Sequence, residues 1–246
     1  MAYLGLETIR RGNTAQCVED IFRIHFPDAK SVIDCTFGAG RFWKWDHQLD
    51  VTGLDIDPPE VSKDDPRLII ADYREIPFEE GSFDVLCYDP PFIFSRGISA
   101  VQGTQRFFMG AEVQGYENRR WSKEHIVKPK NPADLLAHYR RIFEQRNVAT
   151  KGMILKGQDL VVSKDVDWWS FNIFNLGKEM GLGEPTDILI QHSPAHRMSD
   201  PRWKNQWRFR RAHCFYIIYR WAPLPKPAQV EVPDLSNVDQ IGAHLD

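Results

Sequence analysis

The sequence has 246 residues, of which 42% are hydrophobic and 26% charged, and this composition fits one globular domain with a full hydrophobic core. No apolar run approaches the roughly 20 residues that a membrane-spanning helix needs, and the first residues lack the order of a signal peptide, so we expect a soluble, cytoplasmic protein. The net charge of −3 excludes a uniformly basic surface but not local basic patches.

The hydrophobic spacing predicts alternating helices and strands. The first helix is predicted over 14–26, where apolar residues recur at helical spacing before Pro27. A short strand then starts at Ser31 and leads into a glycine turn and a helix through Trp45. Alternating strands and helices are typical of an α/β fold with a parallel sheet. The pattern predicts further helices over 132–143 and 168–174, with the aromatic residues of the second packed on the sheet. It predicts further strands over 51–55, 67–71, 83–88, 152–157, 187–191 and 214–219.

The first strand ends in a Gly-x-Gly turn formed by Gly38 and Gly40. Glycines permit positive φ and allow a ligand to approach the backbone closely. In the dinucleotide-binding fingerprint a third glycine follows three residues later, but Trp43 occupies that position here. A nicotinamide-dependent enzyme is therefore disfavoured.

Acidic residues follow the next three strands, at Asp55, Asp72 and Asp89. Because the carboxyl ends of parallel strands meet at one edge of the sheet, we expect these acids to lie beside the Asp34–Gly40 turn. Open α/β sheets bind their ligands at that edge. Taken singly, Asp55 could equally be a solvated turn residue.

The fourth of these strands ends in Asp89-Pro90-Pro91-Phe92. Two prolines cannot donate to a sheet ladder, so the strand must stop in a rigid turn. The turn offers a carboxylate, the Pro90 carbonyl and the aromatic face of Phe92. Two acceptors beside a flat apolar surface suit a planar ring that carries an amino group. The alternative is an ordinary strand-to-loop turn, with Asp89 capping the backbone.

Together, Asp34-Cys35-Thr36-Phe37-Gly38-Ala39-Gly40 and Asp89-Pro90-Pro91-Phe92 resemble the cofactor loop and the catalytic motif of a known family. This family is the S-adenosylmethionine-dependent methyltransferases that act on the exocyclic amino group of adenine or cytosine in DNA. The resemblance covers the region from Ser31 to Phe92. It implies a Rossmann-like class I fold, with a mostly parallel seven-stranded sheet, helices on both faces and an antiparallel last strand.

The resemblance also implies roles for individual residues. Gly38 and Gly40 would lie near the methionine part of S-adenosylmethionine, Asp55 would bind the ribose hydroxyls and Asp72 the adenine amino group. Asp34 and Thr36 belong to the same predicted cofactor site.

Asp89, Pro90 and Phe92 would be the catalytic residues. Asp at the first position of the motif favours N6 of adenine as the target, and the base must be flipped out or single stranded to reach the turn. The alternatives are an RNA base, cytosine N4, or a cofactor-binding regulatory or structural protein without activity.

Two long segments are basic. The segment 93–131 carries a net charge of +4 and follows the catalytic turn directly, and the segment 192–213 carries +5 with interleaved tryptophans. Arginines and aromatic side chains together can neutralise phosphates and stack on bases, although a structural hairpin is an alternative for 192–213. The predicted substrate-binding residues are Arg197, Lys204, Arg208, Arg210 and Arg211. We therefore expect one methyltransferase domain over 1–221 with two basic insertions, a nucleic acid (DNA) as partner, no metal site, and a loosely ordered acidic tail over 222–246.

Overall fold

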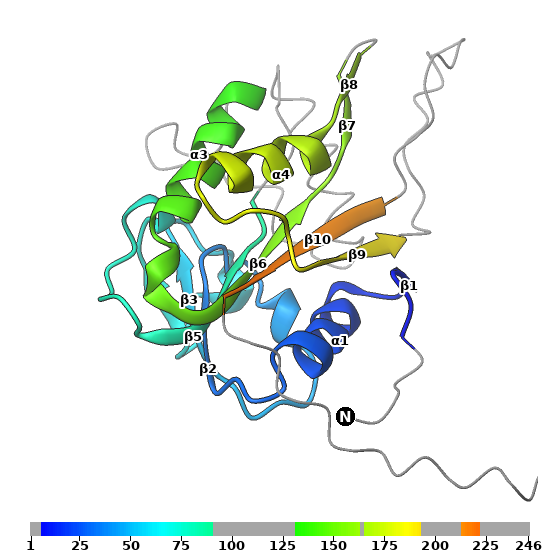
Figure 1. The fold of residues 1–246 in the computed structure, drawn as a ribbon. Coiled ribbons are helices and arrows are strands. Elements are labelled where there is room, and N and C mark those ends of the chain that lie inside the picture. Colours follow the sequence, from blue (N-terminus) through cyan, green and yellow to red (C-terminus); the bar gives the residue numbers. More distant parts are fainter. Residues whose placement is uncertain (1–5, 91–130, 163–164, 193–212, 222–246) are drawn as a thin grey trace, which may run out of the picture.

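The computed structural model describes residues 6–90, 131–162, 165–192 and 213–221 (Figure 1). Its centre is a sheet of eight strands in the order β1-β9-β10-β6-β5-β2-β3-β4. Their bounds are β1 (Ile9–Arg11), β2 (Ser31–Asp34), β3 (Asp50–Asp55), β4 (Leu68–Ile70), β5 (Phe83–Tyr88), β6 (Ala149–Gly157), β9 (Asp187–His192) and β10 (His213–Arg220). A separate hairpin pairs β7 (Leu160–Val162) with β8 (Asp165–Asp167).

The sheet is parallel except at one strand. β10 runs antiparallel to both of its neighbours, β6 and β9, whereas the other pairs are parallel. The expected Rossmann-like α/β class with a reversed last strand is therefore confirmed. One difference is β1, an eighth strand that the sequence did not predict. It has three residues, of which Ile9 is exposed, so it lacks a hydrophobic pattern.

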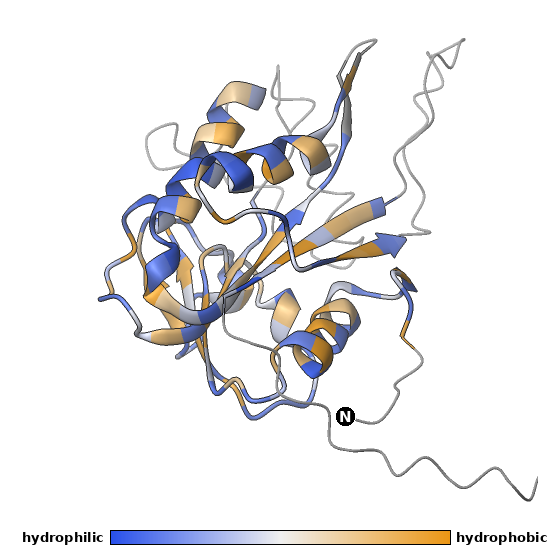
Figure 2. Cartoon of the chain, in the orientation of Figure 1, coloured by the Kyte–Doolittle hydropathy of each residue, from blue (hydrophilic) through white to orange (hydrophobic). Residues whose placement is uncertain are grey.

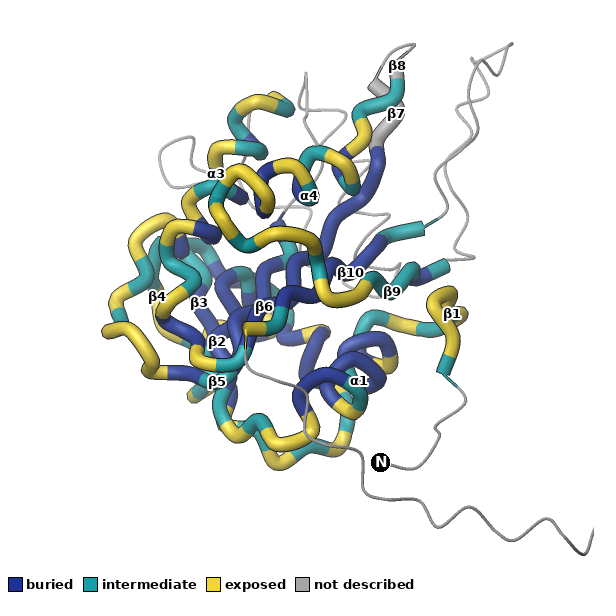
Figure 3. Tube along the Cα trace, in the orientation of Figure 1, coloured by how far each residue is buried: buried dark blue, intermediate teal, exposed yellow. Residues whose placement is uncertain are grey.

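Helices cover both faces of the sheet (Figure 1). On one face lies α1 (Thr14–His25), which starts with a capping box between Asn13 and Gln16. On the other lie α3 (Pro132–Glu144), with Pro132 in its first turn, and α4 (Trp169–Glu179). Two apolar clusters result, one beneath each helical layer. The central strands are hydrophobic and buried (Figures 2 and 3). The packed sheet therefore fixes the positions of the residues at its carboxyl edge.

The crossover segments between β2 and β5 contain single 3-10 turns. The prediction of a helix through Trp45 is wrong, because this segment forms only the 3-10 turn η1 (Arg41–Trp43). The following crossovers contain η2 (Glu60–Ser62) and η3 (Tyr73–Glu75), where Pro58, Pro59, Pro66 and Pro77 interrupt longer helices. A further 3-10 turn, η5 (Arg146–Val148), joins α3 to β6.

The aromatic residues near α4 do not all pack on the sheet. Trp169 is buried, as expected, but Trp168 is 47% exposed and Phe171 61% exposed. The helical period explains this correction: Phe171 lies two residues, or about 200°, from Trp169 and so faces outward, and Trp168 precedes the helix. Among the helices of the described segments, none is long and apolar enough to cross a membrane.

Candidate active site

The Gly-x-Gly turn directly follows β2 at the carboxyl edge of the sheet. Gly38 and Gly40 have φ values of 52° and 62°, so both occupy the left-handed region that favours glycine. The turn is fixed by backbone bonds from Phe37 to Leu54 (3.0 Å) and from Gly40 to Phe37 (2.8 Å). The loop is therefore tied to the end of β3, where Asp55 lies.

Asp55 holds this loop through its side chain. One carboxylate oxygen accepts the Gly38 N–H at 3.0 Å, and the other accepts the Asp57 N–H at 2.9 Å. On the opposite side of the loop, the Ser62 hydroxyl donates to the Gly38 carbonyl at 2.6 Å. The predicted ribose-binding acid and the glycine turn thus form one hydrogen-bonded unit.

Asp72 follows β4 and caps the turn η3. Its carboxylate accepts the Arg74 backbone N–H at 2.9 Å and pairs with the Arg74 guanidinium at 2.6 Å. Burial alone would raise the pKa of Asp72, but the bonds from Arg74 outweigh it and lower the pKa below its usual value. A contact between Asp72 and a cofactor amino group would require Arg74 to share this carboxylate.

Asp34 is the most buried acid of the edge, with 2% exposure. Its two oxygens accept the Thr36 N–H at 3.0 Å and the Trp43 indole N–H at 2.8 Å. Burial raises the pKa of Asp34 to about 7, although both hydrogen bonds favour the charged form. Trp43, which stands at the position of the third fingerprint glycine, therefore has a polar role beneath the loop.

Asp89 lies at the end of β5, between the ends of β2 and β6. Its backbone N–H donates to the Thr36 hydroxyl oxygen at 2.7 Å, which links the predicted catalytic turn to the glycine loop. Its carboxylate pairs with the Lys156 ammonium group at 2.7 Å. Thr36 thus binds the proposed catalytic turn, whereas the sequence had placed it with the cofactor residues.

Lys156 is the residue that the sequence reading missed. It is 9% exposed and lies in β6, whose last six residues are all buried. The available signal was a charged residue inside an apolar central strand, because such a residue needs a partner. The two residues after β6 have structural partners: Gln158 donates to the His213 carbonyl, and Asp159 accepts the Ser170 N–H at the start of α4.

The structure brings together the predicted residues at the ends of β2 to β5 and leaves others untested. Pro90 lies beside Asp89 and is buried. The remaining predicted site residues, Phe92, Arg197, Lys204, Arg208, Arg210 and Arg211, lie outside the described residues, as do the segment 93–130, most of the segment 192–213 and the tail 222–246.

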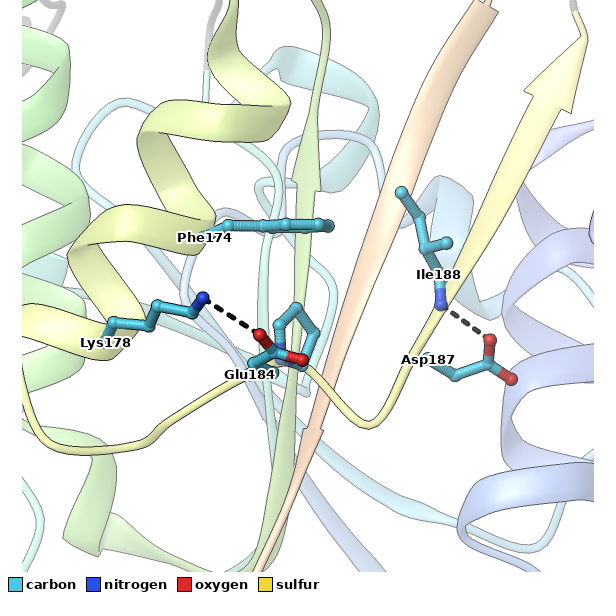
Figure 4. Close-up of a pocket in the computed structure, with 6 residues that line it drawn as sticks. Phe174, Lys178, Glu184, Asp187 and Ile188 are labelled. Carbon is cyan, nitrogen blue, oxygen red and sulfur yellow. Dashed lines mark hydrogen bonds and ion pairs between the residues drawn. The ribbon is translucent and has the colours of Figure 1, made fainter.

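A small surface pocket lies elsewhere. It is lined by Phe174, Lys178, Glu184, Pro185, Asp187 and Ile188, of which Lys178 and Glu184 form an ion pair at 2.9 Å (Figure 4). Asp187 is the first residue of β9, so the pocket is at the amino end of this strand. β9 and β6 both run antiparallel to β10, so β9 has the same direction as β6 and β5. The pocket is thus at the sheet edge opposite Asp89 and contains none of the predicted site residues.

No family model matches the chain, and no curated protein matches it. Solved structures with a similar fold include the PH0226 protein of Pyrococcus horikoshii OT3, with 13% identity over 83% of this chain and 88% of that chain and a TM-score of 0.45. A SAM dependent methyltransferase from Archaeoglobus fulgidus has 12% identity over 85% and 95% of the two chains and a TM-score of 0.42. The sugar N-methyltransferase KedS8 from Streptoalloteichus sp. has 10% identity over 87% and 89% and a TM-score of 0.40. Since the identities are this low and the TM-scores are below 0.5, we argue function from the residues of the site.

Proposed function

We propose that this chain is an S-adenosylmethionine-dependent methyltransferase that acts on the exocyclic amino group of a nucleic-acid base, with N6 of adenine in DNA as the target. The observation that carries the proposal is the Asp89–Pro90 turn at the end of β5, which is hydrogen bonded through Thr36 to the glycine loop after β2. A turn with two acceptors is thereby fixed beside a loop suited to a nucleotide-like ligand.

The residues of the edge fit the proposed cofactor. A Cβ built on Gly38 would meet, among the described residues, a single atom within 4 Å, the Thr36 carbonyl oxygen at 3.8 Å, so a ligand can approach the backbone there. We assign the methionine part of the cofactor to Gly38 and Gly40, the ribose hydroxyls to Asp55 and the adenine amino group to Asp72. When bound, S-adenosylmethionine supplies an electrophilic methyl group on a positively charged sulfur.

The chain's own residues would prepare the amino group for reaction. The nitrogen of an aromatic amine is a poor nucleophile because its lone pair is delocalised into the ring. If the Asp89 carboxylate and the Pro90 carbonyl accept hydrogen bonds from its two N–H groups, the nitrogen is held pyramidal. Its lone pair is then directed out of the plane of the ring. This is catalysis by positioning and by electrostatic stabilisation of the positive charge that develops on nitrogen. After methyl transfer the positively charged nitrogen would lose one proton to water, and Phe92 would stack on the base.

Incubation with tritiated S-adenosylmethionine and DNA, RNA or protein in parallel tests the proposal. We expect label in DNA, recovered after digestion as N6-methyladenine. Asp89→Ala should abolish transfer while cofactor binding persists, and Asp50→Ala, at an exposed position at the start of β3, serves as the control. Full turnover by Asp89→Ala would refute the catalytic role. Label in RNA would show that the substrate is RNA and not DNA. Cofactor binding without label in any polymer would indicate a non-catalytic protein.

A further inference from the structure

Lys156 is a buried cation next to the proposed catalytic acid. Its ammonium nitrogen lies 2.7 Å from Asp89 Oδ2, 5.5 Å from the centre of the Phe42 ring and 5.6 Å from that of Tyr216. Its backbone carbonyl accepts the Tyr139 hydroxyl at 2.5 Å, which anchors this part of β6 to α3. One carboxylate and two aromatic faces therefore surround the charge.

Burial alone would lower the pKa of Lys156, but the charge and hydrogen bond of Asp89, together with the neighbouring Tyr216 and Cys214, outweigh burial and raise the pKa, so the side chain is a cation at neutral pH. Removing an ammonium group from water costs several kcal/mol, and a buried ion pair is often no more stabilising than well-packed apolar residues. Stability alone is thus a weak reason for a lysine at this position. Its contact with Asp89 suggests a role in the site.

The contact limits what Asp89 can do. Lys156 occupies Oδ2, and within the described segments no hydrogen bond to Oδ1 is recorded. An ammonium group that donates to one oxygen fixes the orientation of the carboxylate. Thr36 meanwhile fixes the backbone N–H of the same residue.

We propose that Lys156 is a positioning residue that holds the Asp89 carboxylate so that Oδ1 accepts one hydrogen of the target amino group. This inference rests on the proposed function. It assigns to Lys156 no contact with the base or the cofactor, so its loss should change turnover and leave cofactor binding intact.

The test is a kinetic double-mutant cycle with Asp89→Asn, which keeps an oxygen acceptor but no charge. Lys156→Met should lower kcat about 100-fold, the loss typical of misplacing a reacting group by about 1 Å, with the KM for the cofactor within about twofold. Lys156→Gln keeps an N–H donor, without the charge and on a side chain one bond shorter, and should lose about tenfold. Added to Asp89→Asn, either substitution should cause little further loss, because the group it positions has already lost its charge.

Lys151→Met is the matched control, since this lysine lies in the same strand and pairs with Asp28 and Asp84 at the other end of the sheet. Its turnover should match that of the wild type. If Lys156→Met does not fold, two other variants complete the cycle. These are Lys156→Gln and the double variant Asp89→Asn/Lys156→Met, in which neither member of the ion pair is left as an unpaired charge.

Wild-type turnover in a folded Lys156 variant would overturn the inference, as would losses of the same size with and without Asp89→Asn. Either result leaves the proposed function standing if Asp89→Ala is inactive. Wild-type turnover by Asp89→Ala would instead refute the proposed function itself.

Discussion

Replacing Asp34 with Asn should remove a pH dependence of folding stability that the buried carboxyl creates. Burial raises the pKa of Asp34 from 3.8 to about 7, so between these values the folded protein retains a proton that the unfolded chain releases. The resulting stabilisation is fully present below pH 3.8 and is lost as the pH rises to 7. A pKa difference of this size corresponds to a loss on the order of 4 kcal/mol.

Urea unfolding of the wild type and Asp34→Asn at pH 5, 6, 7 and 8 measures this loss. The free energy of unfolding of the wild type should fall relative to the variant by up to about 1.4 kcal/mol for each pH unit between pH 5 and 7, and the difference should be constant above that range. The amide also replaces an acceptor of the Thr36 or Trp43 N–H, which adds an offset that is the same at every pH.

Asp50→Asn, which changes an exposed carboxyl at the start of β3, is the control for general charge effects. A difference in the free energy of unfolding between the wild type and Asp34→Asn that stays constant from pH 5 to 8 would refute the reasoning. The carboxylate would then be stabilised by its two hydrogen bonds as much as burial destabilises it.

Three further predictions concern the contact of β3 with the glycine loop, the Asp89 turn and the basic segment 192–213. Gly53→Ala should lower the free energy of unfolding by about 1–3 kcal/mol in chemical denaturation, because a Cβ there would overlap the Phe37 ring; unchanged stability would show that the ring can move freely. Thr36→Val should lower turnover about tenfold with cofactor affinity retained, because valine cannot accept a hydrogen bond from the Asp89 N–H. Thr36→Ser should stay active, and equal rates for both variants would contradict this role. Reversing the charge of the arginines at 208, 210 and 211 should weaken DNA binding and flatten its salt dependence, and an unchanged salt slope would show that they do not contact phosphates.

The strand ends were predictable because they depend on local pattern. Asp55, Asp72 and Asp89 each follow a short apolar run, and in a parallel sheet such positions meet at one edge whatever the loops between them do. The sequence could therefore predict which acids gather there. It could not show how each acid is used: Asp55 bonds Gly38, seventeen residues earlier in the chain, whereas Asp72 pairs with its own neighbour Arg74.

Contacts across the sheet were less accessible to sequence reasoning. From the sequence, Trp43 is only a departure from the glycine fingerprint, at the position of its third glycine. In the structure its indole donates to the buried Asp34, so the bulky residue satisfies an acid that the loop buries. Similarly, hydrophobic periodicity cannot pair Lys156 with Asp89, which are 67 residues apart.

The sheet order explains how the Asp89 turn is held. β5 lies between β2 and β6, so residues at the carboxyl ends of both neighbours can reach Asp89, which directly follows β5. From the β2 side Thr36 accepts the Asp89 backbone N–H, and from β6 Lys156 donates to the carboxylate. Pro90 has no N–H to satisfy, and within the described residues the Asp89 carboxylate bonds Lys156 through Oδ2, so the Pro90 carbonyl and Asp89 Oδ1 are the proposed acceptors for a substrate. An ordinary strand-to-loop turn would be stable without a buried ammonium group at its carboxylate, and this arrangement therefore favours an acceptor site over a simple chain reversal.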